Sequence, residues 1–227
     1  KNDLFTLAMS EKAQPLMDAV KKHIKENVEP ITEEFYALES EKDDRWSWHP
    51  RQLELLDGAK AKAKASGLWN FFLTGHEGEG HGLSTVEYAY IAEETGKSRL
   101  APEVFNCSAP DTGNMEVLAK FGSAAQQDQW LRPLLAGEIR STYAMTEPQV
   151  ASSDATNVET AIVRNGSKYV VNGRKWWSSG AMDPRCKLLV VMGKTDLNAP
   201  IHKQQSMILI PADAPGVKII RPLHVFG

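Results

Sequence analysis

The chain has 227 residues, of which 42% are hydrophobic and 24% are charged, as in ordinary globular proteins. This length allows one large domain or two of average size, each with its own core. The formal net charge of −3 gives no electrostatic support for binding nucleic acid or an anionic membrane surface.

The N-terminal 139 residues are predicted to form an α-helical bundle domain. From Leu16 to Val28, apolar residues recur every four positions with charged residues between them, which is typical of an amphipathic helix. Ser10 is its expected N-cap, and Pro30 is expected to end it. Further helices are predicted over residues 53–65, 84–95, 114–121 and 124–135.

A glycine-rich stretch, residues 74–82, interrupts these helices with four glycines in nine residues. Such a composition predicts a turn or a close approach of the backbone. Histidines and carboxylates in the stretch could in principle bind a metal: His76, Glu77, Glu79 and His81. They lack the helical spacing that places two imidazoles on one face, so we predict a solvated loop and no metal.

The two cysteines, Cys107 and Cys186, are far apart and form neither a CxxC pair nor a metal-binding spacing. This indicates a reducing compartment and favours buried, unreactive side chains. Apolar runs such as Leu188 to Met192 are too short to cross a bilayer, so no membrane span is predicted.

From residue 140 to residue 227 the pattern changes to short β-branched runs, which predict a β-barrel or sandwich domain. Asn165-Gly166 lies between two such runs and is a strong hairpin signal, because this dipeptide favours the turn that matches strand twist. The strands are predicted over residues 158–164, 168–172, 188–192, 207–210 and 217–220.

Two segments of this β-domain carry possible ligand groups. Residues 142–154 offer hydroxyls, backbone amides and a turn at Pro148, although such turns usually satisfy only their own backbone. Residues 175–180 contain Trp176 and Trp177. On a strand, adjacent residues point to opposite faces, so one indole could be core and the other free for a ligand. Each motif alone favours a structural role.

Together and in this order, the motifs closely resemble the acyl-CoA dehydrogenase family. The resemblance is carried by Thr146-Glu147-Pro148, by Ser153-Asp154, by the Asn-Gly hairpin and by Gly173-Arg-Lys-Trp-Trp-Ser-Ser179. It extends back through Trp130–Glu138 and covers nearly the whole chain. Within the family, the sequence resembles the branch of human acyl-CoA dehydrogenase family members ten and eleven.

The resemblance implies FAD as the cofactor, held in the crevice between the two domains. Tyr143, Ala144, Met145 and Thr146 would line the flavin ring, with amides and the Thr146 hydroxyl bonding its pyrimidine side. A second group would lie at the other edge: Trp177 beside the ring, with Ser178, and Ser179 reaching N5.

One serine before Asp154 would contact the pyrophosphate or the acyl-CoA. The family commonly has glycines where this chain reads Gln149-Val-Ala-Ser-Ser, one residue longer, so both Ser152 and Ser153 remain candidates. Position 179 is serine where threonine is commoner, which keeps the hydroxyl.

The implied reaction is the FAD-dependent α,β-dehydrogenation of acyl-CoA thioesters to 2-enoyl-CoA in fatty acid oxidation. The family's catalytic base is a glutamate in a C-terminal helical domain that these residues do not include, so no base is assigned. Residues 1–227 alone are therefore expected to be inactive.

The resemblance also implies an electron-transfer flavoprotein as the electron acceptor and a homo-oligomer at full length. It implies a cytoplasmic location in bacteria and a mitochondrial or peroxisomal one in eukaryotes. Two alternatives stay open: an oxygen-reactive relative, such as an acyl-CoA oxidase or a flavin monooxygenase, and a flavin-free binding module.

Overall fold

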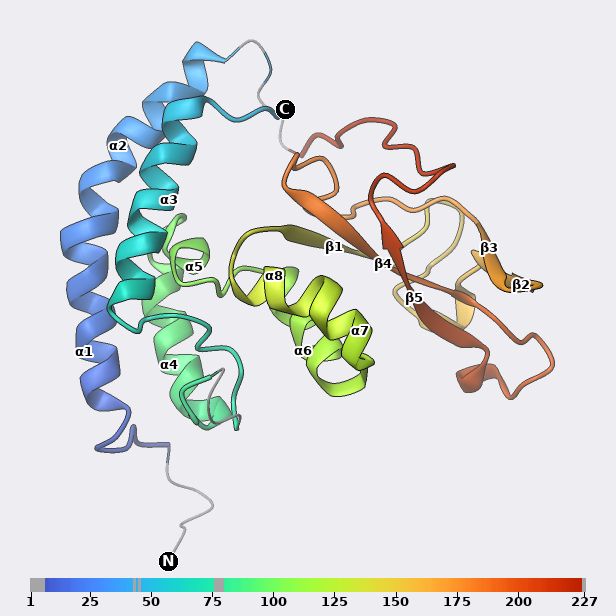
Figure 1. Ribbon diagram of the computed structural model, residues 1–227, viewed down its shortest axis with the longest axis horizontal. Helices are drawn as coiled ribbons and strands as arrows, with labels where there is room; N and C mark the ends of the chain where they lie inside the picture. The colour runs from blue at the N-terminus through green and yellow to red at the C-terminus, as the bar shows by residue number, and fades with distance from the viewer. Residues whose placement is uncertain (1–6, 43, 45, 76–79, 226–227) are drawn as a thin grey trace, which may run out of the picture. The chain divides into compact units, whose positions relative to one another are not determined.

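The computed structural model describes residues 7–42, 44, 46–75 and 80–225 (Figure 1). Internal contacts divide the chain into two compact units, Lys1–Thr112 and Gly113–Gly227. The sequence placed the domain boundary at residue 140, where the composition changes. The internal contacts instead group the helical residues 113–135 with the sheet. No helix in the described part of the chain is long and apolar enough to cross a membrane.

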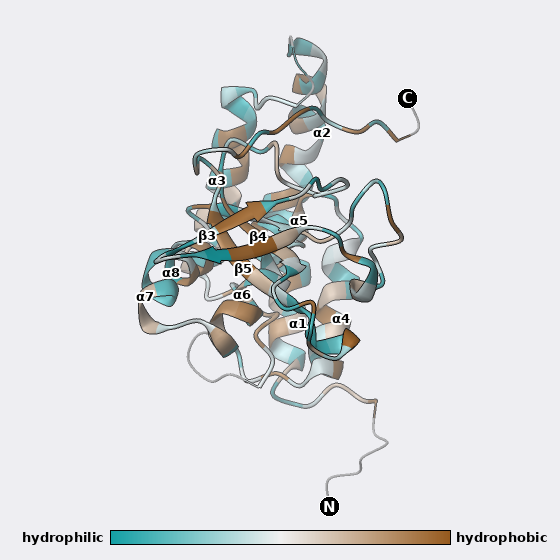
Figure 2. Ribbon diagram, turned by 90° about the vertical axis from the view of Figure 1, so that its right-hand side faces the viewer, coloured by the Kyte–Doolittle hydropathy of each residue, from teal (hydrophilic) through white to brown (hydrophobic). Residues whose placement is uncertain are grey.

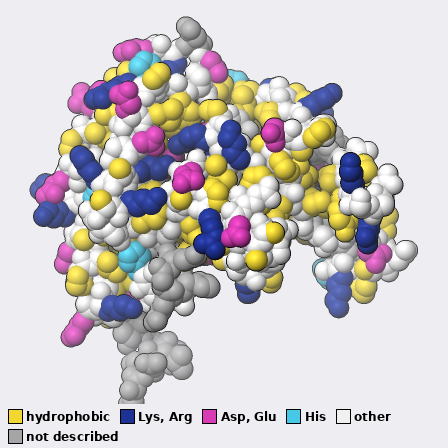
Figure 3. Space-filling model, in the orientation of Figure 1, with side chains coloured by type: hydrophobic (Ala, Val, Ile, Leu, Met, Phe, Trp, Pro, Cys, Tyr) yellow, Lys and Arg dark blue, Asp and Glu magenta, His cyan; other side chains and the backbone are white. Residues whose placement is uncertain are grey.

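The first unit is helical. Its helices are α1 (Gln14–His23), η1 (Ile24–Val28), α2 (Glu29–Ala37), η2 (Leu38–Glu41), α3 (Pro50–Ala65), α4 (Thr85–Gly96) and α5 (Ala101–Val104). Their apolar faces share one core, in which Val20, Phe71 and Phe105 are completely buried. On the face shown in Figure 3, acidic and basic side chains are interspersed over these helices.

The expectation that Pro30 ends the first helix is wrong. The helical run continues through a five-residue π-helix, η1, in which the Glu29 amide bonds to the Ile24 carbonyl. In a π-helix each amide bonds to the carbonyl five residues back, one residue further than in an α-helix. This change occurs directly before Pro30, which has no N–H to donate, so the helix can continue through the proline. The same solution precedes Pro133, where the Arg132 amide bonds to Gln127.

The helix predicted over residues 84–95 is confirmed as α4 (Thr85–Gly96). Ser84 caps α4 in a reciprocal capping box with Glu87. The prediction of Ser10 as the N-cap of the first helix is wrong, because α1 begins at Gln14 and its N-cap is Ala13, without a side-chain cap. Ser10 instead accepts a bond from the Ala13 amide in the turn that leads into α1. The predicted pair of helical segments comes next. The first is α6 (Asp111–Phe121), within which the second unit begins, and the second is the run α7 (Ala124–Gln126), η3 (Gln127–Leu131) and α8 (Arg132–Leu135).

A mixed five-stranded sheet follows in the second unit. Its members are β1 (Arg140–Ala144), β2 (Ala161–Asn165), β3 (Lys168–Asn172), β4 (Cys186–Lys194) and β5 (Gln205–Pro211), with short 3₁₀ turns η4 (Ala155–Asn157) and η5 (Ile201–Lys203). The order is β1-β4-β2-β3, and β5 also pairs with β4. The predicted fold class, a helical domain followed by a β-domain, is confirmed.

Strand β4 organises this sheet. It runs parallel to β1 and antiparallel to β5, and Leu188 and Val190 within it are completely buried. Figure 2 shows β4 and β5 as adjacent, largely hydrophobic strands. The predicted Asn165-Gly166 hairpin is confirmed, since β2 and β3 pair antiparallel around it. A strand over residues 217–220 is wrong: this stretch has no strand partner, and Ile220 is 69% exposed.

Candidate functional site

The two sequence motifs that were predicted to contact a ligand lie side by side in the second unit. Thr142 Oγ1 donates to the Ser179 carbonyl at 2.7 Å, and the Trp176 amide donates to the Thr146 carbonyl at 3.0 Å. Thr146 Oγ1 returns a bond to the Trp176 carbonyl at 2.6 Å. We call residues 142–147 the turn segment and residues 175–180 the tryptophan segment. They run antiparallel, although about thirty residues separate them in the sequence.

The buried carboxylate of Glu147, a residue of the turn segment, forms hydrogen bonds to the tryptophan segment and to the residues before β2. Glu147 is 3% exposed and accepts bonds from the amides of Glu159 (2.8 Å) and Thr160 (2.9 Å). It also accepts the Thr160 hydroxyl at 2.5 Å and Lys175 Nζ at 2.7 Å. The carboxylate therefore joins the turn segment, the entry to β2 and the tryptophan segment.

These donors control the ionisation of Glu147. Burial alone would raise its pKa, but the bonds from Lys175, from the Thr160 hydroxyl and from the two amides outweigh burial and lower the pKa from 4.5 to about 2. Burial also lowers the pKa of Lys175, against the opposing attraction of Glu147. Glu147 is thus held as an anion and is a poor candidate for a general base.

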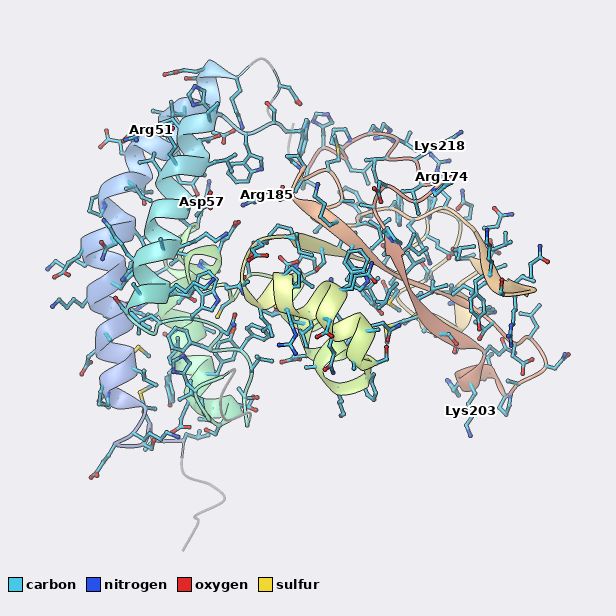
Figure 4. All side chains as sticks on the ribbon, viewed as in Figure 1. Arg51, Asp57, Arg174, Arg185, Lys203 and Lys218 are labelled. Carbon is cyan, nitrogen blue, oxygen red and sulfur yellow. The ribbon has the colours of Figure 1, made fainter. Side chains whose placement is uncertain are left out.

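Lys175 and its neighbour Arg174 have opposite environments. The Lys175 side chain is 12% exposed and also donates to the Met145 carbonyl at 2.8 Å. Arg174, labelled in Figure 4, follows β3 and is exposed. Of these two neighbouring cations, only Lys175 is turned inward, where it bonds to both Glu147 and Met145.

Trp176 and Trp177 do not take the opposite faces of a strand that the sequence suggested. The segment is not a strand, and Trp177 has a φ of +52°, which bulky residues rarely adopt. The two rings touch, with centroids 5.9 Å apart, and Trp177 remains 50% exposed. Neither indole is core, and both are accessible to a ligand. Strain of this kind tends to persist at functional sites.

The two serines that follow differ in their surroundings. Ser178 Oγ is buried and has no hydrogen-bond partner within the described structure. A buried hydroxyl without a partner costs about 1–3 kcal/mol, so this position favours a ligand or water that supplies one. Ser179 is exposed, and its carbonyl is already bound by Thr142. These features fit a segment built to meet a polar ligand.

The residues on β1 and just after it that were predicted to line the flavin differ in how far they are buried. Ala144 is 6% exposed and packs in the apolar cluster with Leu189 and Val191, so only its backbone is available to a ligand. Tyr143 and Met145 are half-buried. Burial raises the pKa of Tyr143, so its phenol stays neutral at physiological pH.

Ser152 and Ser153, which the sequence left as alternatives, are placed very differently. Ser152 is 2% exposed, and its hydroxyl accepts a short hydrogen bond from the Glu147 amide. Ser153 is exposed. The next residue, Asp154, accepts the amide and hydroxyl of Thr156 and so closes the turn. Of the two serine side chains, only Ser153 is open to a ligand.

The glycine-rich stretch is only partly described. His76, Glu77 and Glu79 lie outside the described residues, so the solvated-loop prediction there stays a prediction. His81 Nε2 lies 2.9 Å from the Trp69 carbonyl, and its ring stacks near Phe71. Within the described part of the chain, no group of three or more histidines, cysteines and carboxylates could hold a metal ion.

The cysteines are expected to be chemically inert in the folded protein. Burial raises the pKa of Cys107 to about 12, and Cys186 is 5% exposed in the sheet. Because the thiolate is the reactive form, iodoacetamide at neutral pH should modify neither residue until a denaturant is added. Mass spectrometry of the treated protein measures this, and rapid labelling of native Cys107 would contradict it.

Sequence comparison agrees with these features. The profile of the acyl-CoA dehydrogenase N-terminal domain matches residues 10–138, and the profile of the middle domain matches residues 142–227. The chain belongs to the acyl-CoA dehydrogenase family. Both motif segments fall inside the middle-domain match.

Individual acyl-CoA dehydrogenases support this assignment and the predicted branch. Mouse family member 11 is 52% identical over all of this chain and 28% of its own length. Mouse family member 10 is 54% identical over 93% of the chain and 20% of its own length. FadE2 of Mycobacterium tuberculosis is 54% identical over 87% of the chain and 49% of its own length. The chain thus spans half or less of these relatives.

Solved structures give the same answer for the fold. A structure from Mycobacterium abscessus, assigned to the acyl-CoA dehydrogenases, has a TM-score of 0.89 and 47% identity over 96% of this chain and 54% of its own. The more distant glutaryl-CoA dehydrogenase of Mycobacterium smegmatis has a TM-score of 0.66 and 20% identity over 94% of this chain and 48% of its own.

The sequence motifs named the residues predicted to contact a ligand, but they gave no indication of the hydrogen bonds that join the two segments. No role was predicted for Thr142, Thr160 or Lys175, and Glu147 was assigned only to the turn. A single sequence carries little signal for such contacts, since nothing local links Glu147 to a lysine 28 residues later.

Proposed function

We propose that this chain forms part of an enzyme that dehydrogenates acyl-CoA thioesters to 2-enoyl-CoA in fatty acid oxidation, with FAD as its cofactor. The observation that carries the proposal is the pairing of the turn and tryptophan segments, which brings Thr146, Trp177 and Ser179 onto one part of the second unit. When bound, FAD supplies the acceptor for the hydride that leaves the substrate β-carbon.

Each side chain has a defined task in this proposal. The exposed indole of Trp177 offers a flat apolar face for a tricyclic ring. The Ser179 hydroxyl, which is exposed, would donate to a nitrogen of the flavin ring. The Thr146 hydroxyl already donates to the Trp176 carbonyl, so toward a ligand it acts through its remaining lone pair. Donation on that side then falls to the backbone amides of the turn segment.

Ser153 is the serine that we assign to the pyrophosphate of the cofactor or of the acyl-CoA. Its side chain is exposed, whereas the Ser152 hydroxyl is committed to the Glu147 amide. Ser152 is therefore proposed to shape the turn that presents Ser153, and not to contact the ligand through its side chain.

A structural neighbour supports a flavin on this fold. The glutaryl-CoA dehydrogenase of Mycobacterium smegmatis was solved in complex with FADH2. At full length we further propose a homo-oligomer that passes electrons to an electron-transfer flavoprotein, with the α-proton removed by a carboxylate outside residues 1–227.

The proposal is tested by mixing the purified full-length protein anaerobically with acyl-CoA and following flavin absorption. We expect a yellow protein whose flavin bands bleach with acyl-CoA and recover with electron-transfer flavoprotein. Residues 1–227 alone should give no turnover, because they contain no assigned base. A colourless protein would favour the binding-module alternative. Peroxide production in air at the rate of turnover would favour the oxygen-reactive alternative.

A further inference from the structure

Glu147 and Lys175 form an ion pair in which the Glu147 side chain is 3% exposed and the Lys175 side chain is 12% exposed. The carboxylate receives four donors, from Glu159, from both donors of Thr160, and from Lys175. Lys175 in turn donates to Glu147 and to the Met145 carbonyl. Desolvating two charges is expensive, so a buried pair is a weak source of stability but can specify one arrangement over others.

The pair joins one end of the turn segment to one end of the tryptophan segment. Lys175 is the first residue of the tryptophan segment, and it reaches both Met145 and Glu147 near the end of the turn segment. The next residue, Trp176, then pairs with Thr146, and Ser179 pairs with Thr142. The Lys175 bonds therefore lie in the same antiparallel register as the pairings of Trp176 and Ser179.

We propose that Glu147 and Lys175 are positioning residues that fix the register of the turn segment against the tryptophan segment. They contact no ligand themselves. They hold the backbone next to them, at Thr146 in the turn segment and at Trp176 in the tryptophan segment. In this way they fix the distance from Thr146 to Trp177 and Ser179. This inference rests on the proposed flavin-binding function, because those three residues are its proposed contacts.

The same carboxylate extends this control to the serine turn. The Glu147 amide donates to the Ser152 hydroxyl, and the Glu147 side chain receives the amides of residues 159 and 160 beyond the turn. Both ends of the stretch that carries Ser153 are therefore tied to one residue. Loss of the Glu147–Lys175 pair should therefore weaken both the proposed contacts to the flavin ring and the proposed contact of Ser153 to the pyrophosphate.

Three variants of the full-length protein test the proposal: Glu147→Gln, Lys175→Met and the double variant. Two matched controls accompany them. Arg174→Met removes the adjacent exposed cation and leaves the buried pair intact. Leu189→Ala opens a cavity in the same sheet without touching a bond between the segments, which controls for lost stability.

The first measurement is the dissociation constant for FAD, taken at a temperature at which circular dichroism shows every variant to be folded. Each single variant should weaken FAD binding by about tenfold or more, the equivalent of one charged hydrogen bond. The double variant should lose less than the product of the two single losses, because each single change leaves a buried charge unpaired. Both controls should stay within about twofold of the parent.

The second measurement uses the flavin-free protein, so it does not depend on the proposed function. Acrylamide quenching is compared with and without Trp177→Phe to isolate the Trp177 emission. The pair variants should show raised accessibility of Trp177, and the controls should not.

The proposal is overturned if the pair variants match the parent in both measurements, or if Leu189→Ala weakens FAD binding as much as they do. Failure of the parent itself to bind FAD would refute the proposed function, while a change in Trp177 quenching would still support the positioning role.

Discussion

Replacing Gly173 with alanine is expected to lower the free energy of unfolding of the second unit by about 3 kcal/mol or more. A Cβ at this position would lie 2.1 Å from Thr160 Oγ1 and 2.6 Å from Thr160 Cβ. Thr160 cannot retreat without giving up its 2.5 Å bond to Glu147. The substitution therefore combines a steric clash with the loss of a bond to a buried charge.

Urea unfolding monitored by circular dichroism measures this effect, with Gly113→Ala as the control. Gly113 lies in α6, and a Cβ there would meet nothing within 4 Å. The control should be neutral or more stable by up to about 1 kcal/mol, since alanine is the better helix former. Equal urea midpoints for Gly173→Ala and the parent would show that Thr160 is not held as described.

Acidification is expected to remove a stabilising contribution from Glu147. Its pKa is about 2 in the folded state, against an ordinary value of 4.5. A depressed pKa means that the carboxylate stabilises the fold fully above about pH 4.5 and loses this contribution as the pH falls toward 2. The shift corresponds to about 3 kcal/mol at neutral pH.

Comparison with Glu147→Gln isolates this contribution, because the amide does not titrate. The parent should be more stable than the variant at pH 7, and the difference should narrow steadily as the pH is lowered below 4.5. Asp183 also has a lowered pKa, since its bonds to Arg185 outweigh burial, so Asp183→Asn should keep the Glu147-dependent part of the pH profile. A difference that stays constant from pH 7 to pH 3 would contradict the assignment.

Local signals in the sequence predicted local structure well. Asn165-Gly166 predicted the β2–β3 hairpin, and the helical spacing within residues 84–95 predicted α4, because each signal acts within a few residues. Residues 217–220 have the composition of a strand but no neighbour to pair with, and composition alone cannot supply a partner.

The site required contacts that composition and periodicity do not encode. The motif order identified the family, and with it the residues proposed to face the flavin. The antiparallel pairing of residues 142–147 with 175–180 includes the long-range Glu147–Lys175 contact, and the backbone of Trp177 adopts a conformation that bulky residues rarely take. Such features arise from tertiary structure, which overrides local preference at functional sites.

A crystal structure of the full-length protein with bound FAD is the most direct test of the turn and tryptophan segments as one flavin-binding surface. We expect the isoalloxazine ring against Trp177, with Ser179 at one edge, Thr146 at the other, and the Glu147–Lys175 pair intact behind them. A ring bound elsewhere, or one that leaves Thr146 and Ser179 without contact to it, would contradict this arrangement.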